Sequence, residues 1–245
     1  MAKTGVAIAA DSQATDLEAG IKIVADDKLC RLGTHLVWGF SGAVGLKQLI
    51  RPALEAAHAP DWKRKTIAEL RMPIPERIAT VRKAVAAQHL IAQALPSAEA
   101  MVVGVTGPPG MLKPWILECP SDNIAQEHFR FCAIGSGKKA GYHGYESLRH
   151  YEPHEQPIGL AKLFLFRIMD DAIRAEGFGV GGQIHLWSVT NDGAVEEPGP
   201  AMEDLAQLLD QWRQTEKEGL RGLMKPPGDE PGAEALDTET EESSA

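Results

Sequence analysis

The order of apolar runs and turn residues is the feature of this sequence that most restricts its fold. Four short strand-like runs, at 6–10, 21–24, 28–32 and 35–38, come before any helical segment. The connections between them are too short for the crossover that a parallel pair of strands requires. We therefore expect mainly antiparallel pairing in this part of the chain.

Helical periodicity then alternates with further strands. The spacing of apolar residues predicts helices over 44–54, 75–91, 138–149, 158–176 and 202–223, and strands over 100–106, 113–118, 131–134 and 183–190. The Gly-Pro-Pro-Gly sequence at 107–110 predicts a hairpin between two of the strands. Helices grouped outside hairpin-linked strands indicate an α+β protein, a four-layer α/β/β/α sandwich of two mainly antiparallel sheets.

Charge divides the chain into two parts. The segment after Lys225 holds seven acidic residues and no basic one, and the net charge of −9 falls to −2 when these seven are set aside. We expect residues 225–245 to be an acidic disordered tail, because they cannot bury enough apolar surface to offset the entropy lost on folding. Residues 1–224 are expected to form one domain. Its nearly neutral charge gives no reason to expect nucleic-acid binding.

The cysteines and the apolar runs indicate a compartment. Cys30, Cys119 and Cys132 are odd in number and contain no C-x-x-C pair, so they suggest neither a disulfide framework nor a zinc cluster, and we expect reduced thiols. The apolar runs fall short of the roughly 18–20 residues that span a bilayer, and 1–10 lacks the features of a signal peptide. A cytoplasmic protein with no membrane partner is expected.

Three tempting motifs predict no cofactor or metal site. The G-x-G-x-x-G match at 177–182 follows a helix and enters a strand, the reverse of a dinucleotide site. The stretch 135–138 lacks the first Gly and the Ser or Thr of a phosphate loop. His150 and His154 are separated by Pro153, which would break a helix able to aim both at a metal. We expect neither a cofactor nor a metal.

Five segments, taken in order, resemble proteasome β subunits and the peptidase of the related bacterial two-component protease. They are Gly-Val-Ala-Ile-Ala-Ala-Asp-Ser-Gln-Ala-Thr at 5–15, Lys-Leu-Cys-Arg-Leu at 28–32, Trp-Gly-Phe-Ser-Gly at 38–42, Ala-Ile-Gly-Ser-Gly at 133–137, and the stretch 181–193. The resemblance covers about 5–195, nearly all of the expected domain. It implies the N-terminal-nucleophile hydrolase fold.

The resemblance also implies a site. Active members of the family cleave peptides with an N-terminal threonine whose own α-amine removes the hydroxyl proton. By position, Lys28 would tune that amine, Asp11 would orient Lys28, the N–H of Gly39 would bind the oxyanion, and Ser136 would lie beside the nucleophile. The implied function is a threonine-type endopeptidase of intracellular protein degradation. Implied partners are a ring-forming homo- or hetero-oligomer, a polypeptide substrate and an ATP-dependent unfoldase.

Each of these residues has a simpler interpretation. Lys28 could be an exposed strand lysine, Asp11 a turn former at a strand end, Gly39 a tight bend, and Ser136 a helix cap. The four together and in this order favour the family interpretation.

The sequence departs from the family pattern at its start. Lys3-Thr4-Gly5 occupies the turn of the hairpin whose first arm should carry the threonine, and Thr4 would lie a strand length, roughly 20 Å, from the end where Asp11 and Lys28 meet. A second departure lies at Gly177 and Val180, where active relatives usually carry an aspartate and a serine.

Three hypotheses follow from these departures. The first is a peptidase whose true start lies upstream of Met1. The second is a non-catalytic structural ring subunit. The third is an amidase acting on a small molecule, since one fold can host several activities.

Overall fold

The computed structural model describes residues 1–16, 21–24, 28–56, 67, 73–88, 98–107, 113–120, 124–175 and 179–224. Two structural units divide the chain, Met1–Ala206 and Gln207–Ala245. Both sheets and all the predicted site residues lie in the first unit. Helix α6 (Gly199–Leu223) begins in the first unit and provides the described part of the second.

A five-stranded antiparallel sheet has the order β4-β5-β6-β7-β8. Its strands are β4 (Leu29–Arg31), β5 (Leu36–Gly42), β6 (Ala98–Thr106), β7 (Lys113–Cys119) and β8 (Gln126–His128). The hairpin predicted around 107–110 is present, because β6 and β7 pair from Ala100 with Cys119 to Thr106 with Lys113. Residues 108–110 of its turn lie outside the described residues.

A three-stranded sheet of order β1-β9-β10 brings the two ends of the first unit together. It consists of β1 (Val6–Asp11), β9 (Ile184–Thr190) and β10 (Gly193–Glu196). Strand β1 runs antiparallel to β9, from Val6 opposite Val189 to Asp11 opposite Ile184. A separate hairpin joins β2 (Gln13–Asp16) to β3 (Ile21–Val24).

Alternation along the strands divides the core into two layers. Between the two sheets pack Val6, Ile8, Leu29, Val37, Met101, Val103, Val105, Ile116, Cys132, Val189 and Ala194. The neighbouring residues in sequence, such as Trp38, Val102 and Leu117, point to the other face of the larger sheet and pack against α1 (Val44–Ala56) and α3 (Pro73–Gln88). Successive residues of a central strand therefore pack in alternate layers of the core.

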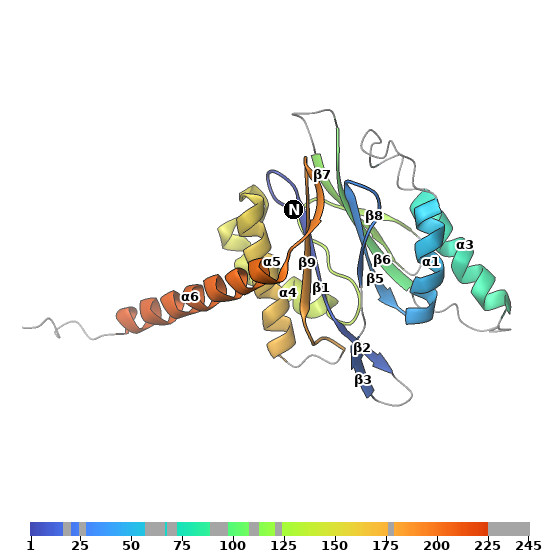
Figure 1. The fold of residues 1–245 in the computed structure, drawn as a ribbon. Coiled ribbons are helices and arrows are strands. Elements are labelled where there is room, and N and C mark those ends of the chain that lie inside the picture. The colour runs from blue at the N-terminus through green and yellow to red at the C-terminus, as the bar shows by residue number, and fades with distance from the viewer. Residues whose placement is uncertain are drawn as a thin grey trace, which may run out of the picture. The chain divides into compact units, whose positions relative to one another are not determined.

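Two more helices cover the three-stranded sheet. Helix α4 (Lys138–Leu148) packs against α5 (Ile158–Arg174), and α5 lies against β1 and β9. Figure 1 shows α1 and α3 on one side of the paired sheets and α4 and α5 on the other. The predicted α+β, four-layer α/β/β/α sandwich of two mainly antiparallel sheets is confirmed.

Several local predictions differ from the structure. Residues 131–134, predicted as a strand, form an extended connection outside both sheets, because β8 takes the edge position beside β7. Strand β8 escaped prediction because Gln-Glu-His has no apolar alternation, and β2 was also missed. Helix α6 begins at Gly199 rather than 202, since Pro200 fits the first turn of a helix, where its missing N–H costs nothing.

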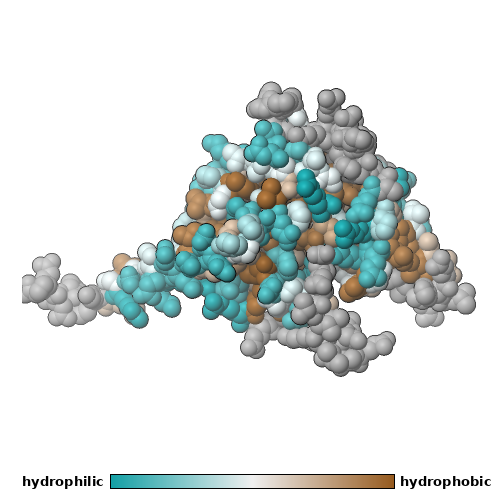
Figure 2. All heavy atoms as spheres, in the orientation of Figure 1, coloured by the Kyte–Doolittle hydropathy of each residue, from teal (hydrophilic) through white to brown (hydrophobic). Residues whose placement is uncertain are grey.

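The surface of the protein contains both hydrophilic and apolar residues (Figure 2). On the face drawn in Figure 2, hydrophilic residues are spread widely with smaller apolar areas between them, as on most globular proteins. Within the described residues, the helices are too short or too polar to cross a membrane. All three cysteines are free, and all three are buried.

Candidate functional site

Asp11 and Lys28 meet at the end of β1. The Lys28 ammonium donates to Asp11 Oδ1 across 2.7 Å, and the lysine side chain is 23% exposed. The second carboxylate oxygen, Asp11 Oδ2, accepts the backbone N–H of Gly181 at 3.0 Å and that of Gln13 at 3.2 Å. Charge-assisted bonds of this kind fix both partners in orientation. Lys28 is therefore a held cation and not a freely exposed strand lysine.

Neighbouring backbone contacts explain why the carboxylate lies there. Strand β1 ends at Asp11, and the next residue, Ser12, donates its N–H to the carbonyl of Gln183 at 2.9 Å. The Ser12 hydroxyl in turn accepts the N–H of Gln183 at 2.8 Å. This two-way link ties the end of β1 to the start of β9. It places Gly181 against Asp11.

Gly39 lies in the middle of β5, opposite Leu29 on one side and Met101 on the other. The adjacent Phe40 donates its N–H to the carbonyl of Lys28 at 3.2 Å, so Gly39 lies beside Lys28 in the sheet. It is strand backbone, and the alternative of a tight bend is wrong. The expected oxyanion role of Gly39 stays a prediction.

Ser136 lies on the exposed turn before α4, and its hydroxyl donates to the carbonyl of Gly179 at 3.1 Å. The N-cap residue of α4 is Gly137, without a side-chain cap, so the helix-cap alternative for Ser136 is wrong. The preceding N–H, of Gly135, is held by Glu99 Oε2 at 2.8 Å. This turn therefore has a fixed place in the sandwich. That Ser136 takes part in catalysis stays a prediction.

Thr4 lies at the opposite end of β1. Residues 3 and 4 form a turn closed by an antiparallel bridge between Ala2 and Gly5, whose N–H···O distance from Ala2 to Gly5 is 2.8 Å. Thr4 is exposed, and a strand of this length holds it roughly 20 Å from Asp11. The predicted position of Thr4 in a turn is confirmed, and it cannot act at the Asp11–Lys28 pair.

The second departure from the family pattern is described in part. Val180 is buried, 6% exposed, and brings no hydroxyl to this place. Gly177 and the neighbouring Glu176 lie outside the described residues.

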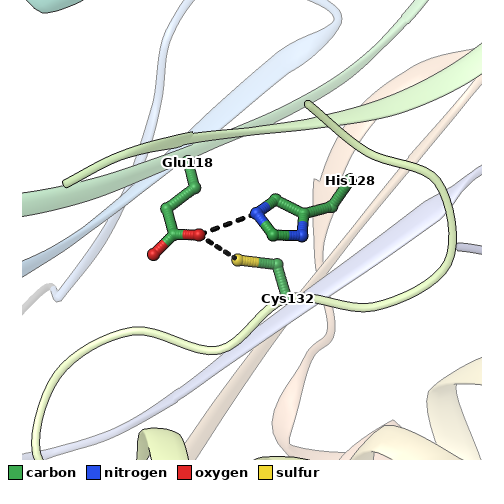
Figure 3. A group of neighbouring side chains, drawn as sticks. All are labelled: Glu118, His128 and Cys132. Carbon is green, nitrogen blue, oxygen red and sulfur yellow. Dashed lines mark hydrogen bonds and ion pairs between the residues drawn. The ribbon is translucent and has the colours of Figure 1, made fainter. Parts of the chain in front are cut away.

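Sequence reasoning missed a second cluster of reactive side chains, centred on Glu118 of β7. Glu118 Oε1 accepts from the Lys138 ammonium at 2.7 Å, and Oε2 lies 2.7 Å from His128 Nε2 and 3.6 Å from Cys132 Sγ. Figure 3 shows the imidazole and the thiol converging on one carboxylate oxygen. The side chains of this cluster come from β7, from β8 and from the connection that follows β8. The spacing of cysteines in the sequence therefore could not predict it.

Burial and charge act in opposite directions in this cluster. Burial by itself would raise the pKa of Glu118, but hydrogen bonds from Lys138 and His128 hold that pKa below its usual value. Burial, with the nearby Glu118 carboxylate, raises the pKa of the Cys132 thiol to about 12. At neutral pH the cluster therefore holds a carboxylate and a protonated thiol.

Comparison with known proteins identifies the fold. Neither a protein family nor a curated protein sequence matches this chain. A solved structure of the helical assembly of the Anbu complex from Pseudomonas aeruginosa is similar, with a TM-score of 0.68 and 18% identity, over 93% of this chain and 96% of that one. At this identity the likeness shows the fold alone. The fold is that of proteasome-related assemblies.

The predicted identity as a proteasome β subunit or two-component protease peptidase is wrong. The similar structure belongs to the Anbu complex, a proteasome-related assembly with a different name. The motifs behind the prediction explain the error. Asp11 ends a strand and Gly135 begins the turn before a helix, so both residues have structural roles in this sandwich.

Proposed function

We propose that this chain is a subunit of a proteasome-related assembly whose site hydrolyses peptide bonds by the N-terminal-nucleophile mechanism. One observation carries the proposal, the 2.7 Å ion pair between Lys28 and Asp11. A held ammonium beside a free α-amine lowers the pKa of that amine, which favours its neutral form as a general base. The pair therefore matches the charged half of such a site.

The reaction would proceed in two balanced steps. The α-amine of an N-terminal threonine takes the proton of its hydroxyl while the oxygen attacks the peptide carbonyl. The α-amine then gives this proton to the departing amine of the cleaved peptide. An ester remains on the threonine. Water attacks this ester, releases the carboxylic acid and restores the hydroxyl.

Strand register supports one position at which an added threonine could be tested. Among the described strands, β1 pairs with β9 alone, and the Ala2–Gly5 bridge begins antiparallel pairing along its other edge. In that register paired residue numbers add up to seven. A strand continuing before Met1 would place the residue about five positions upstream opposite Asp11. A threonine added at that position would therefore lie near the Asp11–Lys28 pair.

The experiment adds this strand. Two versions of the chain carry the same five-residue extension, one starting with Thr and one with Ala, each exposed by cleavage of a leader. We expect the Thr version alone to hydrolyse fluorogenic peptides and to gain the mass of an electrophile directed at N-terminal threonine. Lys28→Met should abolish both readouts, while Lys83→Met, on the exposed face of α3, should leave them unchanged. A folded Thr version that shows neither turnover nor adduct would contradict the proposal.

A non-catalytic structural subunit is the second candidate. The exposed Thr4 at the wrong end of β1 and the buried Val180 favour it. In that case the chain assembles, but neither extended version turns over peptide.

Self-assembly belongs to both candidates. The similar Anbu structure is a helical assembly, and from it we propose association of this chain with its own copies. Native mass spectrometry tests this directly, because a monomer at micromolar concentration would contradict it.

We also propose a cytoplasmic location and a polypeptide substrate. The ATP-dependent unfoldase implied by the resemblance stays a prediction.

A further inference from the structure

We propose that Glu118, His128 and Cys132 bind a divalent transition-metal ion of the zinc class. The three side chains each offer one ligand atom, and these atoms lie within 4.8 Å of one another. They come from β7, from the end of β8, and from the connection that leads to α4. The site is separate from the Asp11–Lys28 pair and does not depend on the proposed peptidase function.

The distances from Glu118 Oε2 to the other two ligand atoms are close to those of a tetrahedral site. With bonds of about 2.3 Å to sulfur and 2.0–2.1 Å to nitrogen and oxygen, ligand atoms around zinc lie about 3.3–3.6 Å apart. The separation of Cys132 Sγ from Glu118 Oε2 is already 3.6 Å. His128 Nε2, now 2.7 Å from the same oxygen, would have to move away by only about 0.6 Å.

The donor set selects the metal. A thiolate, an imidazole and a carboxylate suit zinc or cobalt, whereas magnesium and calcium prefer oxygen alone. Binding would release the Cys132 proton to solvent, so that a thiolate and the Glu118 carboxylate both face the ion. A water molecule would complete four-coordination.

Surrounding groups hold the ligands in place. Lys138 occupies Glu118 Oε1 at 2.7 Å, so Oε2 is the oxygen left for a metal. Tyr142 lies close enough to Cys132 to lower the pKa of the thiol, against the effect of burial. Contacts of this kind orient metal ligands and raise affinity.

The simpler interpretation is a buried carboxylate neutralised by Lys138 and hydrogen-bonded to His128. This accounts for Glu118 but not for the thiol. Cys132 and His128 approach the same carboxylate oxygen from different elements (Figure 3), although Lys138 already supplies one full positive charge. Convergence of three different donor types on one point is what a metal site requires.

Cobalt provides the test, because its bond to a thiolate absorbs in the near ultraviolet and its visible bands report tetrahedral geometry. Protein stripped with a chelator is titrated with Co²⁺ and then with Zn²⁺. We expect one cobalt per chain, a thiolate charge-transfer band that zinc removes, and a higher Tm with either metal.

Matched variants identify the ligands. Cys132→Ser should remove the thiolate band, and Cys119→Ser should keep it, because Cys119 is adjacent to Glu118 in sequence but faces the other layer of the core. His128→Gln should lower cobalt affinity at least about tenfold, whereas the exposed His150→Gln should not change it.

Three results would overturn the proposal. The first is folded, stripped protein that shows no thiolate band at stoichiometric cobalt. The second is a band that persists in Cys132→Ser or disappears equally in Cys119→Ser. The third is unaltered cobalt affinity in His128→Gln. This variant decides if Cys132→Ser does not fold, since the His128 side chain is 21% exposed and tolerates change.

Discussion

Lys138 Nζ lies 2.7 Å from Glu118 Oε1, an ion pair between the first turn of α4 and the inner face of β7. The two partners differ in exposure, since the Glu118 side chain is 4% exposed and that of Lys138 is 43% exposed. The same carboxylate lies 3.6 Å from Cys132. Glu118 thus holds both ends of the segment that carries Ser136.

This asymmetry predicts unequal costs for removing each partner. Lys138→Met leaves a buried carboxylate without its ammonium partner and should lower the free energy of unfolding by about 3 kcal/mol. Glu118→Gln leaves an ammonium that water can reach and should cost about 1 kcal/mol. Urea unfolding in the presence of a chelator measures both. Lys139→Met, at an exposed neighbouring position, is the control, and equal costs for the two partners would refute the explanation.

Much of the fold could be predicted because local pattern and tertiary role agree. Strand β1 is apolar and short, α5 has an apolar stripe, and 107–110 consists of the turn-forming residues Gly and Pro. The local sequence of each segment therefore predicts its structure. The approach of Lys28 to Asp11 was also predicted, through the resemblance. The structure shows it as an ion pair of 2.7 Å, and its catalytic role is a proposal.

The rest depends on contacts between distant segments. Strand β8 is polar and forms because β7 offers it an edge, while 131–134 is apolar yet joins no sheet. Glu118 appears in the sequence as one charged residue in an apolar strand. Only folding brings His128 and Cys132 to its carboxylate, and a search by cysteine spacing cannot find a ligand set that uses one cysteine.

Asp11→Asn should destabilise the protein by about 2 kcal/mol. The amide has one oxygen, which must serve the N–H groups of Gly181 and Gln13, so its NH₂ group then faces the Lys28 ammonium, a donor against a donor. Thermal or urea unfolding gives the cost, and amide exchange at Gly181 should become faster. Asp192→Asn, in an exposed turn that suits asparagine, should stay within about 0.5 kcal/mol of wild type. Unchanged stability of Asp11→Asn would contradict the bonding scheme.

The outer layer of the core depends on one face of α1. Leu54 is 0% exposed and packs in the cluster beneath α1 and α3, whereas Leu49 on the same helix is 53% exposed. Leu54→Ala should cost about 3 kcal/mol because it removes apolar contacts and leaves a cavity. Leu49→Ala should change the free energy of unfolding by less than about 0.5 kcal/mol. Similar losses at both positions would mean that α1 packs on a different face.

The turn before α4 depends on the absence of a side chain at Gly135. Its φ is +76°, and a Cβ there would press on the Ser41 hydroxyl and lie 2.9 Å from Ser41 Cβ. Gly135→Ala should therefore cost about 3 kcal/mol, of which about 1 is backbone strain and the remainder steric overlap.

A double-mutant cycle separates these two terms. In a Ser41→Gly background the overlap is gone but the strain remains, so Gly135→Ala should then cost only about 1 kcal/mol, a coupling of about 2 kcal/mol. Gly159→Ala in α5, where a Cβ meets nothing within 4 Å, is the matched control and should be nearly neutral. Additive effects of the Gly135 and Ser41 substitutions would show that β5 and the turn carrying Ser136 do not touch, and would remove the structural basis for placing Ser136 at the site.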